Sequence, residues 1–234
     1  MKDLPAATQP LGSQRAREIA AAFASERSFA GRWAWHYSRS KLATDPLYPG
    51  VCEVLRGSRE PLLDLGCGLG LLVHALRAEG IGLPYVGLDN DAGKIARART
   101  AAASACLPEA QFICTDLTGA LPAHRGSVAI LDMLQYIDPA SQARLLAGAI
   151  AMLTPGALLV IRTGLEDGSQ RARLTHAVDA FSNLLGWMNT GPKRYPNEAQ
   201  LRATFDAAGL ESRFSALHGN TPFNNWRIVA RMRD

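Results

Sequence analysis

The chain has 234 residues, 47% of them hydrophobic and 20% charged, a composition typical of a folded soluble protein with one α/β domain and not of a disordered chain. Lys and Arg number 25 against 21 Asp and Glu, so the net charge is +4, and the scattering of the basic residues favours a solvated surface over a nucleic-acid-binding patch. No apolar stretch is long enough for a transmembrane helix, the first residues lack the apolar core of a secretory signal, and the four cysteines form no CxxC pair. We therefore expect a cytoplasmic protein with reduced thiols.

The first part of the chain predicts a helical cap. Residues 1–12 contain helix-breaking prolines and predict a flexible tail, and Ser13 could cap a helix over 14–29. An aromatic cluster follows, made of Phe29, Trp33, Trp35, His36 and Tyr37. A short helix is expected over 46–56, with its proline near the first turn. We take 1–58 as an N-terminal tail and helical cap, and 59–234 as the main part of what is a single domain overall.

Strands and helices alternate beyond this cap. Strands are expected over 61–64, 85–88, 111–114, 128–131 and 157–162, with helices over 69–79, 91–104 and 141–153. Further helices are expected over 171–185 and 197–209, and strands over 210–217 and 226–232 suit an antiparallel pair. The pattern predicts an α/β fold with a mostly parallel seven-stranded sheet that ends in an antiparallel hairpin.

A glycine-rich turn follows the first of these strands and opens a helix. Its glycines stand at alternate positions, Gly66, Gly68 and Gly70, so the backbone can turn tightly and a ligand can lie against it. The helix N-terminus behind it suits an anionic group. The spacing is GxGxG, and Leu71 stands where a pyrophosphate-binding turn would have glycine. This disfavours an NAD-dependent dehydrogenase and favours a ligand without pyrophosphate.

Aspartates lie at the carboxyl ends of four successive strands: Asp64, Asp89, Asp116 and Asp132. Ligands of open α/β sheets bind at this edge, and a carboxylate at Asp89 could accept hydrogen bonds from both hydroxyls of a ribose. Any one aspartate could be a simple turn former, but four in succession indicate a binding site.

These segments together resemble the class I S-adenosylmethionine-dependent methyltransferases, which have a Rossmann-like fold. LLDLGCGLG is similar to the first motif of that family, VGLDND to the second, FICTDL to the third, VAILDMLQYID to the fourth-strand motif and LTPGALLVIR to the entry of strand five. The resemblance covers roughly residues 60–163 and implies S-adenosyl-L-methionine as cofactor, with S-adenosyl-L-homocysteine as product. It specifies fold and cofactor, and leaves the substrate open.

The resemblance also implies roles for single residues. Gly66, Cys67, Gly68 and Gly70 would line the methionine part of the cofactor, with Asp64 near its ammonium group. Asp89 would hold the ribose, while Asn90, Asp116 and Leu117 would lie at the adenine. Asp132 and Met133 would lie near the sulfonium and the acceptor.

Several absences narrow the acceptor. No [DN]PP[YFW] sequence and no Pro-Cys dipeptide follow strand four, which disfavours exocyclic amines of DNA and 5-methylcytosine chemistry. Gln135 and Tyr136 stand where the similar quinone-pathway O-methyltransferases carry a metal-associated acidic and histidine pattern, so we predict no metal. Residues 39–48 are similar to a stretch of methyltransferases of bacterial aryl-polyene pigment clusters. That similarity implies a small aromatic, phenolic or polyene-precursor acceptor, free, carrier-protein-bound or lipidic.

Aromatic residues are the candidate contacts for this acceptor. Trp33 and Tyr37 could form a lid, but they could also be a hydrophobic patch that anchors the N-terminal helix or a contact with a membrane. Tyr136 is both a substrate-binding candidate and the favoured general base, with His36 flanking the acceptor. Other candidates for the base are Tyr37, His176, Tyr195 and His218.

Two other functions stay open at this point. An RNA or tRNA methyltransferase would explain the many arginines, although no appended RNA-binding module is present. A non-catalytic binding subunit of the same fold is the second alternative, although all the cofactor motifs are intact. The sequence predicts no particular oligomeric state.

Overall fold

The computed structural model describes residues 8–24, 29–107, 109–166, 194–219 and 224–233. The chain forms two compact units, one up to Leu117 and one from Thr118, and each is described by itself. The predicted helix over 171–185, and His176 with it, lie outside the described residues. This boundary differs from the division after residue 58 that the sequence suggested. The division into a cap and a main part remains a prediction.

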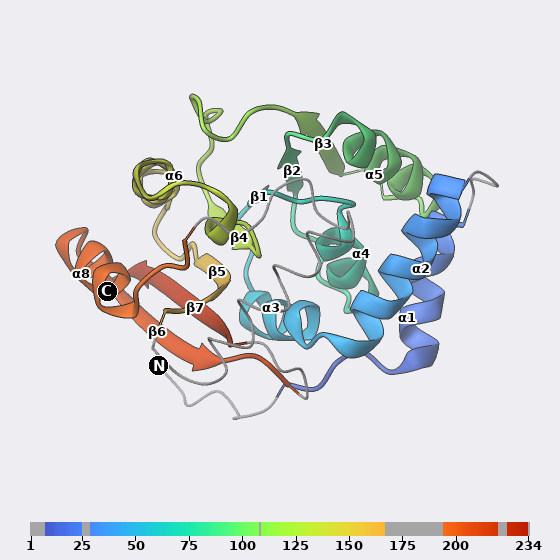
Figure 1. The fold of residues 1–234 in the computed structure, drawn as a ribbon, viewed down its shortest axis with the longest axis horizontal. Coiled ribbons are helices and arrows are strands. Elements are labelled where there is room, and N and C mark those ends of the chain that lie inside the picture. Colours follow the sequence, from blue (N-terminus) through green and yellow to red (C-terminus); the bar gives the residue numbers. More distant parts are fainter. Residues whose placement is uncertain (1–7, 25–28, 108, 167–193, 220–223, 234) are drawn as a thin grey trace. The chain divides into compact units, whose positions relative to one another are not determined.

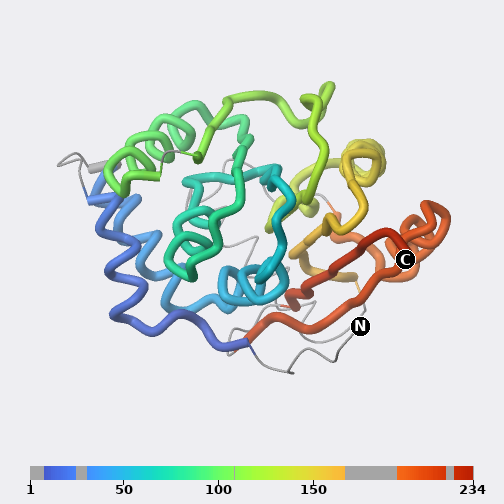
Figure 2. Tube along the Cα trace, turned by 180° about the vertical axis from the view of Figure 1, so that it is seen from behind, coloured from blue at the N-terminus to red at the C-terminus, as the bar shows by residue number. Residues whose placement is uncertain are grey.

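The first unit begins with four helical elements. They are α1 (Ser13–Ala20), the 3-10 helix η1 (Ala21–Phe23), α2 (Phe29–Thr44) and α3 (Leu47–Leu55). Both views show α1 and α2 running side by side (Figures 1 and 2). The Asp45 carboxylate stabilises the first residue of α3, because it accepts a hydrogen bond from the Leu47 amide at 3.0 Å.

The helix α2 was not predicted, because the aromatic segment was expected to follow a helix that ran to residue 29. Its buried positions are small or aliphatic and recur at helical spacing: Gly31, Ala34, Ser38 and Leu42. The large aromatic residues Trp33 and Tyr37 lie on the exposed side instead. An amphipathic helix is usually recognised by a stripe of large apolar residues on its buried side. In α2 the large aromatic residues lie on the exposed side instead.

The first unit continues with a parallel three-stranded sheet in the order β3-β2-β1. Its elements are β1 (Leu62–Leu65), α4 (Leu71–Ala78), β2 (Tyr85–Asp89), α5 (Ala92–Ser104) and β3 (Ala110–Cys114). Leu62 is in register with Tyr85, and Tyr85 with Ala110. Every residue of β1 is buried, as expected for a strand that is covered on both faces. These elements confirm the predicted alternation to within a few residues at their ends.

The second unit contains β4 (Ser127–Leu131), the 3-10 helix η2 (Leu134–Tyr136), α6 (Pro139–Ala151), β5 (Leu159–Gly164), α8 (Glu198–Ala207), β6 (Leu210–Ala216) and β7 (Asn225–Met232). Its strand order is β4-β5-β7-β6, with β4 parallel to β5. β7 is antiparallel to both of its neighbours. Asp138 caps α6, which begins at Pro139, two residues before the predicted start.

The predicted fold class is confirmed. Seven strands form a mostly parallel arrangement, and the last two make the predicted antiparallel hairpin. Within the residues that the structure describes, no helix has the length and apolar character to cross a membrane.

Candidate cofactor site

The glycine-rich turn lies between β1 and α4 and is held against the next strand. The backbone amides of Gly66 and Cys67 both donate to the Leu88 carbonyl, at 2.8 and 2.9 Å. Gly66, Gly68 and Gly70 have φ values of 83°, 57° and 73°, in the left-handed region that glycine adopts without strain. A Cβ atom at Gly68 would meet nothing within 4 Å, so this stretch of backbone is open to a ligand.

Two glycines of the first unit are needed for close packing beneath this turn. A Cβ atom at Gly70 would lie 2.5 Å from Cε1 of Phe112, and one at Gly87 would lie 2.8 Å from Sγ of Cys67. The thiol of Cys67 therefore packs over β2, and burial raises its pKa above the ordinary range of a thiol. This makes Cys67 a packing residue of the turn and a poor nucleophile.

Asp89 ends β2 and is buried, with 8% of its surface exposed. Its Oδ2 accepts a hydrogen bond from the Gly68 amide at 2.9 Å, and its Oδ1 accepts one from the Asp91 amide at 2.9 Å. Each carboxylate oxygen can accept a further bond, so the group could still take two ribose hydroxyls. Asn90 follows it and is exposed.

Asp64, the acidic residue just before the glycines, is fully enclosed in β1. Its Oδ2 accepts a hydrogen bond from the Tyr85 hydroxyl at 2.6 Å, whereas its Oδ1 is buried and has no partner. Burial raises the pKa of this carboxyl group to about 7, the Tyr85 hydrogen bond lowers it, and the Asp89 charge raises it. The sequence did not indicate Tyr85, because its contact with Asp64 spans two strands.

The end of β3 completes this edge of the first unit. The Thr115 amide donates to the Asp89 carbonyl at 3.0 Å, which ties the residues after β3 to the end of β2. Asp116 is exposed and Leu117 is buried. The carboxyl ends of β1, β2 and β3 thus carry all nine predicted cofactor residues that belong to this unit: Asp64, Gly66, Cys67, Gly68, Gly70, Asp89, Asn90, Asp116 and Leu117.

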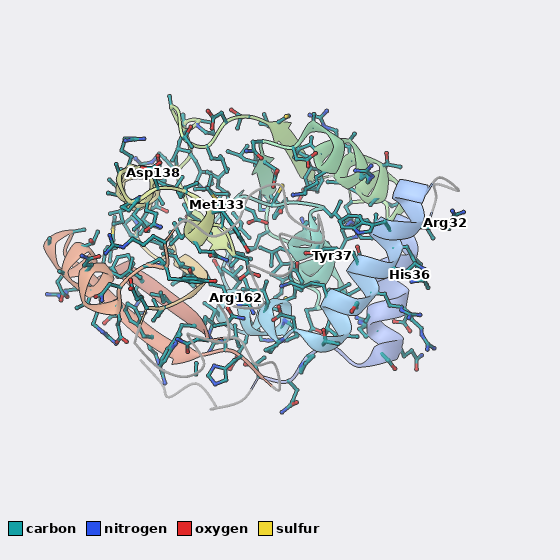
Figure 3. All side chains as sticks on the ribbon, in the orientation of Figure 1. Arg32, His36, Tyr37, Met133, Asp138 and Arg162 are labelled. Carbon is teal, nitrogen blue, oxygen red and sulfur yellow. The ribbon has the colours of Figure 1, made fainter. Side chains whose placement is uncertain are left out.

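The second unit places the remaining predicted cofactor residues, Asp132 and Met133, directly after β4. Asp132 has a φ of 55°, which is unusual for a residue other than glycine. Its carboxylate forms an ion pair with the guanidinium of Arg162 on β5, and its amide donates to the Arg162 carbonyl at 2.8 Å. Met133 and Arg162 are labelled in Figure 3. No motif in the sequence indicated that Arg162 would pair with Asp132.

The turn after Asp132 is also held by polar contacts. Gln135 is buried, and its Oε1 accepts a hydrogen bond from the Thr163 hydroxyl at 3.2 Å. Tyr136 is half-buried in η2. Gln142 of α6 donates to the carbonyls of Leu134 and Arg194, both at 2.9 Å. Within the described part of the chain, no group of three or more His, Cys, Asp or Glu residues is arranged to hold a metal ion.

The predicted acceptor contacts on α2 lie on its surface. The Trp33 and Tyr37 rings are 38% and 41% exposed and stack on each other, with centroids 5.1 Å apart and an interplanar angle of 11°. This exposure argues against a buried anchoring patch. His36 packs edge-on against Trp35 at 4.6 Å, and Figure 3 shows His36 and Tyr37 on different sides of α2.

Two other base candidates lie in the second unit. Tyr195 is buried against β5, so closely that a Cβ atom at Gly164 would lie 2.6 Å from its Cε1. His218 is half-buried just after β6.

Comparison with known proteins agrees with this arrangement. Residues 62–156 match a family model described as a methyltransferase domain. No curated protein matches the chain.

Solved structures share the fold. Magnesium protoporphyrin IX methyltransferase from Synechocystis PCC 6803, crystallised with bound SAH, is 16% identical over 94% of each chain, with a TM-score of 0.61. The pyocyanin biosynthetic protein PhzM is 19% identical over 92% of this chain and 62% of its own, with a TM-score of 0.63. The mitomycin 7-O-methyltransferase MmcR is 17% identical over 95% of this chain and 61% of its own, with a TM-score of 0.63.

The fold is that of the class I methyltransferases. Residues 62–156 match a methyltransferase domain, and the Synechocystis methyltransferase of the same fold was crystallised with SAH and also with SAM. The residues of the first unit fit this cofactor: the buried Oδ1 of Asp64 lacks the cationic partner that an ammonium group would supply, and the backbone at Gly68 is open.

Proposed function

We propose that this protein transfers a methyl group from S-adenosylmethionine to a small aromatic, phenolic or polyene-precursor molecule. The observation that carries the proposal is the stacked pair Trp33–Tyr37, which lies exposed on a helix of the unit that also holds the glycine turn. Exposed aromatic faces favour planar, apolar partners, since flat rings stack with little loss of conformational entropy. PhzM and MmcR, whose names refer to small-molecule chemistry, support the same substrate class.

The cofactor supplies an activated methyl group when it is bound, so the residues of the protein mainly have to bind, orient and exclude water. We assign Gly66, Cys67, Gly68 and Gly70 to the methionine part and Asp64 to its ammonium group. Asp89 takes the ribose hydroxyls, and the adenine lies by Asn90, Asp116 and Leu117. The resemblance of the fourth-strand motif to that of the family implies that Asp132 and Met133 serve the sulfonium end. Alignment of the acceptor alone can lower the barrier by roughly 7–11 kcal/mol in favourable cases.

Proton removal from the acceptor is assigned first to Tyr136. It lies four residues after Asp132, in the short helix η2 that the Gln135 and Gln142 contacts hold in place. His36 is the second candidate, and its ring contact with Trp35 would have to change if the imidazole is to reach a substrate. Turnover retained in full by both Tyr136→Phe and His36→Ala would remove both assignments, since a general base contributes about 10²–10⁴-fold.

We further propose that the acceptor is carried on an acyl-carrier protein or a lipid, or is free in the cytoplasm. This part of the proposal rests on the resemblance to pigment-cluster methyltransferases that the sequence of residues 39–48 suggests. All four cysteines are free thiols, which suits a reducing compartment. Burial raises the pKa of the Cys52 thiol to about 12, so this group stays protonated and unreactive.

The test begins with the cofactor and continues to the acceptor. Calorimetry should show micromolar binding of S-adenosylhomocysteine and none of NADH. Transfer of labelled methyl from S-adenosylmethionine is then measured to phenolic acids in free form, as carrier-protein thioesters and in lipid vesicles, and to total RNA. Label in RNA alone would support the RNA methyltransferase alternative, and label in none of them, despite cofactor binding, would support a non-catalytic subunit.

The aromatic pair is tested on whichever acceptor takes the label. Trp33→Ala and Tyr37→Ala should each raise KM for the acceptor and leave the affinity for S-adenosylhomocysteine within about twofold. Ile113→Ala is the matched control, because Ile113 is a similarly exposed apolar residue on β3, with 43% of its surface accessible. An equal effect of all three substitutions would exclude the pair as the acceptor contact.

A further inference from the structure

The register of β1 and β2 places Asp64 and Tyr85 on the same face of the sheet. Leu62 is in register with Tyr85 and Asp64 with Gly87, and neighbours in register point to the same side. Gly87 has no side chain between them, so the phenol of Tyr85 can reach along the strand to Asp64. Its hydroxyl donates to Oδ2 of Asp64 at 2.6 Å, a short distance for a bond between two oxygens.

Both side chains are cut off from water. Tyr85 is 1% exposed and Asp64 is 2% exposed. The charges that act on the pair come from Asp89 at the end of β2, Cys67 in the turn and Tyr48 on α3. A carboxyl, a thiol and a phenol carry no positive charge in either protonation state, so none of these three groups supplies one to Asp64.

The two oxygens of Asp64 therefore differ. Oδ2 has a hydrogen-bond donor, and Oδ1 is buried without one. A buried carboxylate with an unsatisfied oxygen is costly, and burial accordingly raises the pKa of Asp64 to about 7. A large part of the ligand-free protein thus holds a proton on Asp64 at neutral pH. A cation that arrived at Oδ1 would remove the cost of ionisation.

We propose that Tyr85 is a positioning residue of the cofactor site, which holds Oδ2 of Asp64 so that Oδ1 is left for the ammonium group of the cofactor, and that cofactor binding expels the Asp64 proton. This inference rests on the assignment of Asp64 to the ammonium group. The protonated carboxyl and the charged ammonium become a carboxylate–ammonium pair, and one proton passes to the solvent. Tyr85 keeps its own proton throughout, because burial raises its pKa well above its usual range.

Calorimetry with S-adenosylhomocysteine tests the proton release directly. Titrations at pH 6, 7 and 8, each in two buffers of different ionisation enthalpy, count the protons released on binding. We expect close to one proton at pH 6 and close to none at pH 8, together with an affinity that rises by about tenfold between these pH values. The sign follows because only ionised Asp64 pairs with the ammonium group, and this form predominates above pH 7.

Variants separate the two residues. Tyr85→Phe removes the hydrogen bond that favours ionisation, so proton release should continue to higher pH and the affinity at pH 7 should fall several-fold. Asp64→Asn should bind more weakly, with no proton release and no dependence on pH. Tyr48→Phe removes a hydroxyl from another buried tyrosine near the pair and should leave the pH profile of the wild type unchanged.

A second ligand distinguishes the possible failures. 5′-Methylthioadenosine contains the adenosine and lacks the amino acid, so its binding should release no proton and should be unaffected by Tyr85→Phe. Binding of S-adenosylhomocysteine without proton release in the wild-type protein would overturn the inference, even if the Tyr85 variant did not fold. Failure of both ligands to bind would instead contradict the cofactor site itself.

Discussion

The carboxylate of Asp89 accepts a hydrogen bond from the backbone amide of Gly68, with 2.9 Å between Oδ2 and the nitrogen. This bond joins the end of β2 to the middle of the glycine turn, at the point where the backbone is open. The residue assigned to the ribose therefore also fixes the backbone assigned to the methionine part of the cofactor.

We expect Asp89→Ala to weaken S-adenosylhomocysteine binding by more than about 1 kcal/mol, roughly fivefold or more, because a charged hydrogen-bond acceptor is lost. Calorimetry measures the change. Asp91→Ala is the matched control, since Asp91 caps α5 through the Lys94 amide at 3.0 Å and its own amide remains bonded to Asp89. That variant should lose about 1 kcal/mol of stability and keep its affinity. Equal losses of affinity would refute a specific role for Asp89.

Gly70 has a second requirement besides its positive φ, and alanine substitution should reveal it. Gly57→Ala meets strain alone, because φ is 84° there and a Cβ would meet nothing within 4 Å. We expect this variant to lose about 1–2 kcal/mol of unfolding free energy in urea titrations. Gly70→Ala should lose about 1–3 kcal/mol more, because its methyl group would meet the Phe112 ring. Phe112→Leu in the Gly70→Ala background should recover part of that difference.

His74 on α4 should make the protein sensitive to mild acid. It is 5% exposed, its ring lies 5.0 Å from that of Phe23, and burial lowers its pKa to about 4. The unfolded chain takes up this proton near pH 6.5 and the folded chain only near pH 4, so stability falls as the pH drops through this interval. We compare the unfolding free energy of His74→Leu with that of the wild type at each pH. The difference should favour the variant by on the order of 2 kcal/mol more at pH 5 than at pH 7.5.

Asp64 acts in the opposite direction, because its raised pKa removes stability as the pH rises from about 4 to about 7. The comparison of variant with wild type at each pH cancels this contribution. Urea unfolding supplies the free energies, and the same stability difference at both pH values would show that His74 does not titrate between them.

The Asp132–Arg162 ion pair should matter for stability far more than an exposed pair of the same kind. The Arg162 side chain is 3% exposed. Arg162→Met leaves Asp132 without this counter-charge, and we expect a loss of about 3–5 kcal/mol, which Asp132→Asn in the same chain should partly restore. Arg231→Met breaks a pair with Glu211 in which both side chains are more than a third exposed, and should cost less than about 1 kcal/mol.

The double-mutant comparison also tests the role in turnover that we propose for Asp132. Arg162 could serve mainly to hold Asp132 in its left-handed conformation. Turnover should then fall in Arg162→Met, and adding Asp132→Asn should recover little of it, because the arginine that holds this conformation is still missing. Full recovery of turnover together with stability would indicate that the ion pair contributes to folding alone.

Local sequence patterns predicted most of this architecture. The strands and helices predicted between residue 61 and Ala151 lie within a few residues of their expected places, because hydrophobic period, caps and glycine turns are encoded by neighbours along the chain. The helix α2 was missed because its buried residues are small, and its large aromatic residues face outward. Hydrophobic periodicity predicts that large apolar residues lie on the buried side of a helix, and in α2 this expectation is wrong.

The sequence by itself determined the fold class and the residues at the strand ends, since each of these depends on short segments whose spacing suffices to recognise them. Only the tertiary structure decided which groups those residues meet: Tyr85 at Asp64, Gly68 at Asp89 and Arg162 at Asp132. These contacts join different segments of the chain, and they depend on strand register and burial. A pattern along one segment carries no information about the register of the next, so the partners of each aspartate became visible only in three dimensions.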